Sequence, residues 1–181
     1  GVDKIAFTGS TEVGKIIARA AADNLKKVSL ELGGKAPNIV FADADIEQAV
    51  NGAMMGIFFN QGQVCCAGSR LFVQDDVKEE FIGRLKEKSA KINVGDPMDK
   101  ATHMGPQVSE EQLNRIKGYC DVAQQEGATV VSGGVTPKLE GAFQKGYFFQ
   151  PTIFSDVKNQ MRVAQEEIFG PGVSVISFSD E

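Results

Sequence analysis

The chain has 181 residues, of which 42% are apolar and 24% charged, and this composition indicates one globular domain or a large piece of one. A formal net charge of −5, without any cluster of lysine and arginine, argues against a nucleic-acid surface. No apolar run approaches the roughly 18 residues of a membrane span. Three cysteines and one histidine, with no Cys-x-x-Cys, argue against a zinc site. We therefore expect no nucleic acid, membrane or metal as a partner.

Strand-like and helix-like segments alternate along the chain, which predicts an α/β fold. In chain order we expect strands at 4–7, 27–32, 38–41, 71–73, 129–132, 152–154 and 173–178, with helices at 11–22, 46–59, 77–91 and 109–126. Residues 95–107 and 133–146 are expected to be loops, the second joining two strands of a hairpin. The chain begins directly at a strand and ends just after one. We therefore expect both ends to be cuts through a larger protein, so that targeting signals are not predictable.

Two helix starts have capping signals. Asp43 or Asp45 can cap the helix that begins at Ile46. Ser109-Glu110-Glu111-Gln112 has the pattern of a capping box, in which the first and fourth side chains each bond to the other's backbone N–H.

The segment Gly9–Lys15 lies between a predicted strand and a predicted helix and fits the phosphate-binding pattern G-x-x-x-x-G-K. Ile16 stands where a magnesium-binding Ser or Thr should follow, and Glu12 adds a negative charge, so a P-loop nucleotide hydrolase is disfavoured. A strand–turn–helix still directs backbone N–H groups at an anion, and Ser10 could donate to a pyrophosphate. The alternative is an ordinary helix start capped by Ser10 or Thr11.

Glu31 is the one carboxylate inside the apolar run Val28–Leu32. Burial would raise its pKa, as a general base working near neutral pH requires. The alternation of apolar and polar residues along this strand also permits Glu31 to point into solvent. Both interpretations stay open on this segment alone.

Cys65 lies in a segment of glycines and small residues that follows Phe58-Phe59 at the end of a predicted helix. A tight turn of this kind suits a reactive thiol, although an arbitrary cysteine is more often buried and inert. A Cys–His hydrolase would have to use His103, the only histidine. Any other base must be a carboxylate, and Glu31 is the obvious candidate.

Glu166-Glu167-Ile168-Phe169-Gly170-Pro171 ends in a predicted Gly-Pro turn. A carboxylate suits a ribose diol and an aromatic ring could flank a flat heterocycle. Glutamate-rich helix ends are common, so this segment is weak evidence by itself.

Four ordered segments together resemble the NAD(P)-dependent aldehyde dehydrogenase superfamily: 7–14, 30–37, 58–69 with Gly62-Gln63-Val64-Cys65 at its centre, and 167–171. The separation of Glu31 and Cys65 fits the family as well. The resemblance implies an aldehyde dehydrogenase-like α/β fold, in which the end of a Rossmann-like cofactor domain (1–32) is followed by an incomplete α/β catalytic domain (33–181).

The resemblance also implies roles for individual residues. Cys65 is expected to be the nucleophile, Glu31 the general base, and Cys66 only a neighbour. Ser10 is expected at the pyrophosphate, Glu167 at the ribose on the nicotinamide side, and Phe169 at the nicotinamide. The expected cofactor contacts are Gly9, Ser10, Gly14, Leu32, Gln112, Arg115, Glu167 and Phe169, and the expected substrate contacts are Phe59 and Val64.

By the same resemblance, a small aldehyde is oxidised to a free carboxylic acid through a thioester on Cys65, which Glu31 helps to hydrolyse. The implied cofactor is NAD or NADP, with NAD favoured. The complete protein is expected to be a cytoplasmic homodimer or homotetramer, and this chain alone is expected to be inactive because part of its site is absent.

Overall fold

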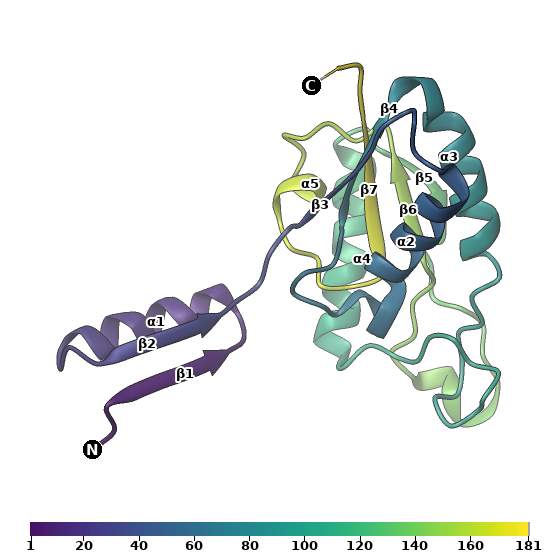
Figure 1. Cartoon of the computed structure of the whole chain (residues 1–181). Helices are drawn as coiled ribbons and strands as arrows, with labels where there is room; N and C mark the ends of the chain where they lie inside the picture. The colour runs from purple at the N-terminus through teal and green to yellow at the C-terminus, as the bar shows by residue number, and fades with distance from the viewer. Residues whose placement is uncertain (181) are drawn as a thin grey trace. The chain divides into compact units, whose positions relative to one another are not determined.

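The computed structural model describes residues 1–180 and consists of two compact units, Gly1–Gly34 and Lys35–Glu181. The first unit contains β1 (Lys4–Thr8), α1 (Thr11–Ala22) and β2 (Lys27–Glu31). The two strands are parallel, and parallel neighbours require a crossover connection, which α1 supplies along one face of the pair (Figure 1). These three elements confirm the predicted strand–helix–strand order. The domain boundary expected after residue 32 stays a prediction.

The second unit is built on a five-stranded sheet in the order β3-β4-β7-β6-β5. Its strands are β3 (Pro37–Val40), β4 (Arg70–Gln74), β5 (Thr129–Ser132), β6 (Thr152–Ser155) and β7 (Gly172–Phe178). All neighbouring pairs are parallel except β5 and β6, which form the predicted hairpin. The helices are α2 (Ile46–Phe58), α3 (Asp75–Ser89), α4 (Glu110–Gln125) and α5 (Arg162–Gln165), with 3-10 turns η1 (Phe59–Gly62) and η2 (Gly141–Lys145).

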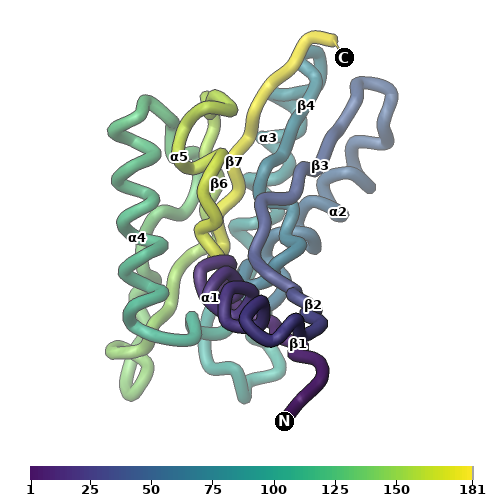
Figure 2. Tube along the Cα trace, turned by 90° about the vertical axis from the view of Figure 1, so that its left-hand side faces the viewer, coloured from purple at the N-terminus to yellow at the C-terminus, as the bar shows by residue number. Residues whose placement is uncertain are grey.

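Helices cover both faces of this sheet. Alternate strand residues point to opposite sides, and both sets are apolar, so each face must be buried. Leu71 and Val73 of β4 join the apolar core beneath α2 and α3, whereas Phe72 packs against the core beneath α4 and α5. Val173 and Ile176 of β7 divide between the two cores in the same way. Figure 2 shows α4 and α5 on one side of the strands and α2 on the other. The second unit is therefore a three-layer α/β/α structure, and this confirms the predicted α/β fold.

Local polar contacts explain where two helices begin. Of the two candidate caps for α2, Asp45 is the one used, since its carboxylate accepts from the Gln48 backbone N–H at 3.1 Å. Ser109 caps α4 by accepting from the Gln112 N–H at 3.2 Å. The four-residue helix α5 was not predicted, because so short a segment has no periodic pattern to detect.

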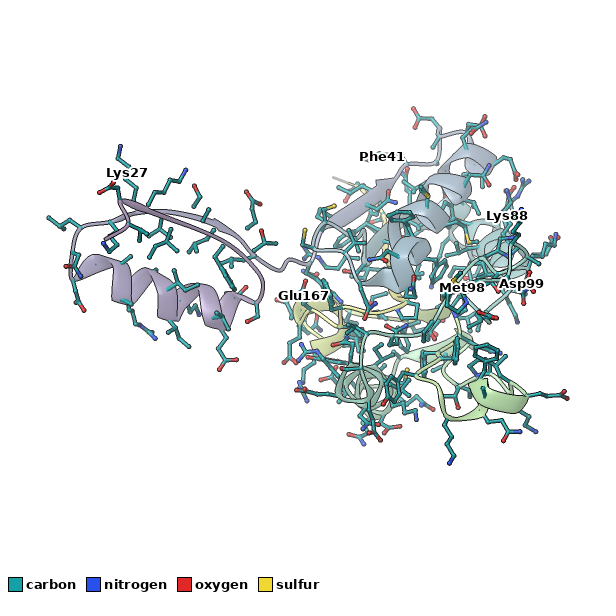
Figure 3. The ribbon with its side chains drawn as sticks, turned by 90° about the horizontal axis from the view of Figure 1, so that it is seen from below. Lys27, Phe41, Lys88, Met98, Asp99 and Glu167 are labelled. Atoms are coloured by element: carbon teal, nitrogen blue, oxygen red, sulfur yellow. The ribbon has the colours of Figure 1, made fainter. Side chains whose placement is uncertain are left out.

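The outer helices α2 and α3 are joined by exposed ion pairs. Glu47 of α2 pairs with Arg84 at 3.2 Å and with Lys88, which Figure 3 labels, both on α3. Such exposed pairs add little stability, so the apolar cores hold the layers together. Within residues 1–180, the structure has no helix with the length and apolar character needed to cross a membrane.

Candidate active site

The turn between β1 and α1 is bound to the end of β2. The Gly9 backbone N–H donates to the Glu31 carbonyl at 3.0 Å, and Thr8 lies opposite Glu31 in the strand register. Ser10 is the N-cap of α1, and its hydroxyl oxygen accepts from the Val13 N–H at 3.2 Å. The first turn of a helix leaves backbone N–H groups without intrahelical acceptors, so this turn presents donors suited to an anion.

Gly14 allows α1 to pack closely on the end of β2. A Cβ added at Gly14 would lie 2.6 Å from Cδ2 of Leu32, far inside van der Waals contact. Glycine at this position therefore sets the distance between helix and strand, which in turn places the Ser10 turn beside Glu31. The structure thus brings Gly9, Ser10, Gly14 and Leu32 together within the first unit.

Glu31 is exposed at the end of β2. Val28 and Leu30 are partly buried while Ser29 and Glu31 are exposed, so the strand has the alternation that permitted a solvent-facing carboxylate. Glu31 is therefore not buried in this chain. Its carboxylate is accessible to water.

Cys65 occupies a tight turn after η1. The Ala67 backbone N–H donates to the Val64 carbonyl at 3.1 Å, which makes Cys65 and Cys66 the two central residues of a β-turn. Both thiols are exposed. Cys120, by contrast, is buried in α4, and burial, with a smaller effect of Asp121, raises its thiol pKa from 9.0 to about 12. Because a protonated, inaccessible thiol is a poor nucleophile, Cys65 and Cys66 are the only reactive candidates.

A left-handed backbone segment leads into this turn. Asn60, Gln61 and Gly62 have φ values of 48°, 58° and 72°. Side-chain-bearing residues in this region cost of order 1 kcal/mol each or more, and such strain persists where the surroundings hold it. Side-chain amides supply part of that support, since Gln61 Nε2 donates to the Pro106 carbonyl at 3.4 Å and Gln63 Oε1 accepts from the Val108 N–H at 3.0 Å.

His103 belongs to a different part of the second unit. Its Nδ1 accepts from the Asn93 backbone N–H at 3.0 Å, and the backbone N–H of His103 donates to the Asn93 carbonyl at 2.8 Å. These bonds hold the loop after α3 together. The imidazole is thus employed in loop structure, and the Cys–His hydrolase hypothesis gains no support.

Side chains on one face of α4 hold the segment 166–169. Gln112 Nε2 donates to the carbonyls of Ile168 at 2.9 Å and Phe169 at 2.7 Å. Arg115 Nη2 donates to the Glu167 carbonyl at 2.5 Å. The expected capping box is thus only half formed, because the Gln112 side chain is directed to this segment. In this structure Gln112 and Arg115 contact the backbone of the motif, and their contact with a cofactor stays a prediction.

Glu166 is held by two further groups. Arg162 Nε and Nη2 donate to its carboxylate at 2.9 and 3.0 Å, and the Tyr119 hydroxyl donates at 2.7 Å. These hydrogen bonds, the Arg162 contribution being the larger, lower the pKa of Glu166 from 4.5 to about 2. Tyr119 lies on the same face of α4 as Gln112 and Arg115, with its ring almost fully buried.

Glu167 and Phe169 follow on the same segment, where Figure 3 labels Glu167. Glu167 is partly buried, and Phe169 has a φ of 59° with 36% of its surface exposed. Neighbouring contacts hold the strained Phe169 backbone, because a Cβ added at Gly170 would lie 2.5 Å from Cδ1 of Ile116. Both residues are therefore presented from a fixed loop.

The cysteine loop and this segment touch directly. A Cβ added at Gly62 would lie 2.2 Å from the Gly170 carbonyl oxygen and 2.8 Å from the Pro171 nitrogen. Only a glycine allows the two backbones to approach so closely. Two motifs more than a hundred residues apart in sequence are therefore in contact in the second unit.

Lys35, just after the glutamate motif, has a buried ammonium nitrogen without a hydrogen-bond partner among residues 1–180. Burial, followed by repulsion from Arg70, lowers its pKa from 10.5 to about 8, against a raising effect of Glu167 and Glu166. Arg70 is held close by its Nε, which donates to the Lys35 carbonyl at 2.9 Å.

The two expected substrate contacts differ in exposure. Phe59, the first residue of η1, is 60% exposed, whereas Val64 is partly buried against the core beneath α2 and α3. Among residues 1–180, no cluster of three or more His, Cys, Asp or Glu residues has the arrangement of a metal site.

The family model described as "Aldehyde dehydrogenase family" matches residues 1–181. The chain belongs to the aldehyde dehydrogenase family. The P-loop hypothesis is accordingly abandoned. The α/β arrangement is that of a segment of aldehyde dehydrogenase structures.

Relatives of this family member are similar over nearly its whole length. It is 52% identical over 178 residues to a betaine aldehyde dehydrogenase of Brucella anthropi, covering 98% of this chain and 36% of that one. It is 54% identical over 181 residues to an aldehyde dehydrogenase of Emericella nidulans, covering 99% and 35%. A crystal structure of Staphylococcus aureus betaine aldehyde dehydrogenase with NAD+ matches with a TM-score of 0.94 at 47% identity, covering 99% and 35%. The chain therefore spans little more than a third of these relatives.

The sequence analysis gave no role to Tyr119 or Glu166, and none to the side-chain amides of Gln61 and Gln63 that hold the cysteine loop. Gln112, Arg115 and Tyr119 are spaced i, i+3 and i+7, so their shared helix face was readable. What that face contacts depends on residues about 50 positions later, which no local pattern indicates.

Proposed function

We propose that residues 1–181 carry the nucleophile, the general base and part of the cofactor site of an enzyme that oxidises an aldehyde to a carboxylic acid with NAD+ or NADP+. The observation that carries this proposal is the exposed Cys65 turn in contact, through Gly62 and Gly170, with the segment that holds Glu167 and Phe169. The named activity of the Brucella anthropi and Emericella nidulans relatives supports it. NAD+ in the Staphylococcus aureus structures favours NAD+ as the cofactor.

The residues present fit a dinucleotide. The N-terminus of α1 offers backbone N–H groups, and the Ser10 hydroxyl accepts from Val13 but still has its own hydrogen to donate to a phosphate. Glu167 would accept hydrogen bonds from a ribose diol, and Phe169 would flank the nicotinamide. Side chains of α4 hold the backbone of both residues in place for these contacts. When bound, the nicotinamide supplies the hydride acceptor that the oxidation requires.

Cys65 performs the first step of the proposed mechanism. Its thiolate adds to the aldehyde carbonyl and forms a thiohemiacetal, whose oxidation leaves a thioester on the same sulfur. Within residues 1–180 the backbone N–H groups of Cys65 and Cys66 donate to no acceptor, and they are available to a developing alkoxide. Donors of this kind contribute roughly 100- to 1000-fold in rate.

Glu31 performs the last step by taking a proton from the water that opens the thioester. Its exposed position at the end of β2, bound to the Ser10 turn through Gly9, suits a base that must meet water near the cofactor. Hydrolysis releases a free carboxylic acid and restores the thiol. Val64 and Phe59 are the residues that we propose to contact the aldehyde.

The test needs the full-length enzyme, meaning the protein that contains residues 1–181 in its complete reading frame. Cys65→Ala should abolish aldehyde-dependent NADH formation, whereas Cys66→Ala, which removes the adjacent exposed thiol, should retain it. Glu31→Gln should accumulate an acyl-enzyme detectable by intact mass, and Glu140→Gln on the hairpin loop should not. Undiminished steady-state turnover of Glu31→Gln would remove Glu31 from this role.

We also propose the larger organisation. Residues 1–32 would end the cofactor domain and residues 33–181 would belong to the catalytic domain, which the two compact units of the structure support. The full-length enzyme would be a cytoplasmic homodimer or homotetramer. Sedimentation equilibrium distinguishes these assemblies from a monomer.

A further inference from the structure

The contacts between α4 and residues 166–169 run in strict reverse order. Tyr119 contacts Glu166, Arg115 contacts Glu167, and Gln112 contacts Ile168 and Phe169. One helix face therefore binds four consecutive residues of the proposed cofactor segment. Each of the three backbone carbonyls in 167–169 has a side-chain donor, so the shape of this loop depends on α4.

Tyr119 is the centre of this set of contacts. Two guanidinium groups lie near its ring, with Cζ of Arg115 at 5.3 Å and Cζ of Arg162 at 6.0 Å from the ring centroid. Arg115 binds the Glu167 carbonyl and Arg162 binds the Glu166 carboxylate. A cation over an aromatic face is attracted to it, so one buried ring orients both arginines.

The Tyr119 hydroxyl completes the arrangement by donating to Glu166 at 2.7 Å. This bond fixes the first residue of the segment, while the close approach of Ile116 to Gly170 fixes the residue that follows it. Phe169 lies between these anchors with a positive φ, a conformation that an aromatic residue keeps only where its surroundings enforce it. Loosening either anchor would allow Phe169 to relax.

We propose that Tyr119 is a positioning residue for cofactor binding: through Glu166, Arg162 and Arg115 it fixes the backbone from which Glu167 and Phe169 reach the dinucleotide. The inference rests on the proposed function, because it assigns Glu167 and Phe169 to the cofactor. Tyr119 itself would touch neither substrate nor cofactor. Its removal should therefore weaken cofactor binding without altering the chemistry at Cys65.

The test compares Tyr119→Phe with Tyr147→Phe in the full-length enzyme. These are the only two tyrosines of the chain, and each variant loses one hydroxyl. For Tyr119→Phe we expect the Kd of NADH, measured by fluorescence titration, and the KM for NAD+ to rise about ten-fold, equivalent to about 1.4 kcal/mol. We expect kcat at saturating NAD+ to change by less than about two-fold. Tyr147→Phe should match the unaltered enzyme in all three values.

A second variant keeps the test decisive if Tyr119→Phe fails to fold. Glu166→Gln keeps the size of the side chain but removes its charge, and it should raise the same Kd. In the double variant, the Kd of NADH should rise by much less than the product of the two single fold-changes, because both substitutions break the same interaction. If the two fold-changes in Kd multiply in the double variant, the two residues act independently and the proposal is contradicted.

An unchanged Kd for NADH in Tyr119→Phe, with Cys65→Ala inactive, overturns the positioning role and leaves the proposed function intact. A fully active Cys65→Ala variant overturns the proposed function instead. An equal loss of NADH affinity in Tyr119→Phe and Tyr147→Phe also overturns the positioning role.

Discussion

Replacing Gly62 by alanine probes the contact that joins the cysteine loop to the segment 166–171. Gly62 has a φ of 72°, so any side chain is strained there. An added Cβ would also lie 2.2 Å from the Gly170 carbonyl oxygen, a backbone atom that no side-chain rotation can move away. The substitution therefore combines two separate costs.

The size of each cost follows from the geometry. The left-handed backbone alone costs an alanine about 1 kcal/mol or more. Restoring even a 3.0 Å contact requires the two backbones to separate by about 0.8 Å, and overpacking of this kind costs roughly 1–3 kcal/mol. We expect Gly62→Ala to destabilise the full-length enzyme by about 3 kcal/mol.

Two other glycines serve as matched controls. Gly127, after α4, has a φ of 96° with nothing near an added Cβ, so Gly127→Ala incurs only the backbone cost of about 1 kcal/mol. Gly52, inside α2, also has open space around it, and Gly52→Ala should stabilise by about 0.5–1 kcal/mol. Thermal unfolding midpoints rank the three variants, and the alkylation rate of Cys65 by iodoacetamide reports on the site.

Gly62→Ala should have the lowest midpoint and an altered alkylation rate, since its displaced backbone lies three residues before Cys65. Equal midpoints for Gly62→Ala and Gly127→Ala would show that the contact with Gly170 contributes nothing. Gly62 would then not be the residue that joins the two motifs.

Three further outcomes are expected of the full-length enzyme. Because the pKa of Glu166 is depressed to about 2, its stabilising contribution is present above pH 4.5 and is lost as the pH falls towards 2; Glu166→Gln should show a flatter acid-unfolding curve over that range. Lys35 has a pKa lowered from 10.5 to about 8, so its burial destabilises the protein below pH 8 and less at higher pH; Lys35→Met should raise the melting temperature at pH 7, and the gain should vanish above pH 10.5. Iodoacetamide at pH 7 should label Cys65 and Cys66, and peptide mass spectrometry should find Cys120 labelled only after unfolding.

Much of the fold was readable from local patterns. The helix 11–22 and the strands around it were predicted nearly to the residue, because Ser10, the apolar spacing and the following turn all indicate the same boundaries. The hairpin of β5 and β6 was likewise indicated by its glycine-containing loop. The helix α5 and the 3-10 turns were missed, since single helical turns are set by tertiary contacts.

The site was only partly readable. The tight turn at Cys65 follows from its small residues, but the left-handed φ of Gln61 does not, because glutamine has no preference for that conformation. The capping-box pattern correctly placed the start of α4 and wrongly assigned the Gln112 side chain. That side chain binds Ile168 and Phe169, and a contact across more than 50 residues competes with the local bond.

The pairing of α4 with residues 166–169 also has a consequence for the order of folding. Its hydrogen bonds close loops of 47 to 57 residues, and such loops lose chain entropy before their contacts form. The segment can take its final shape only after α4 has docked on the sheet. The region that contains Glu167 and Phe169 should therefore form late in folding. Bound NADH should then lower the unfolding rate constant more than it raises the folding rate constant.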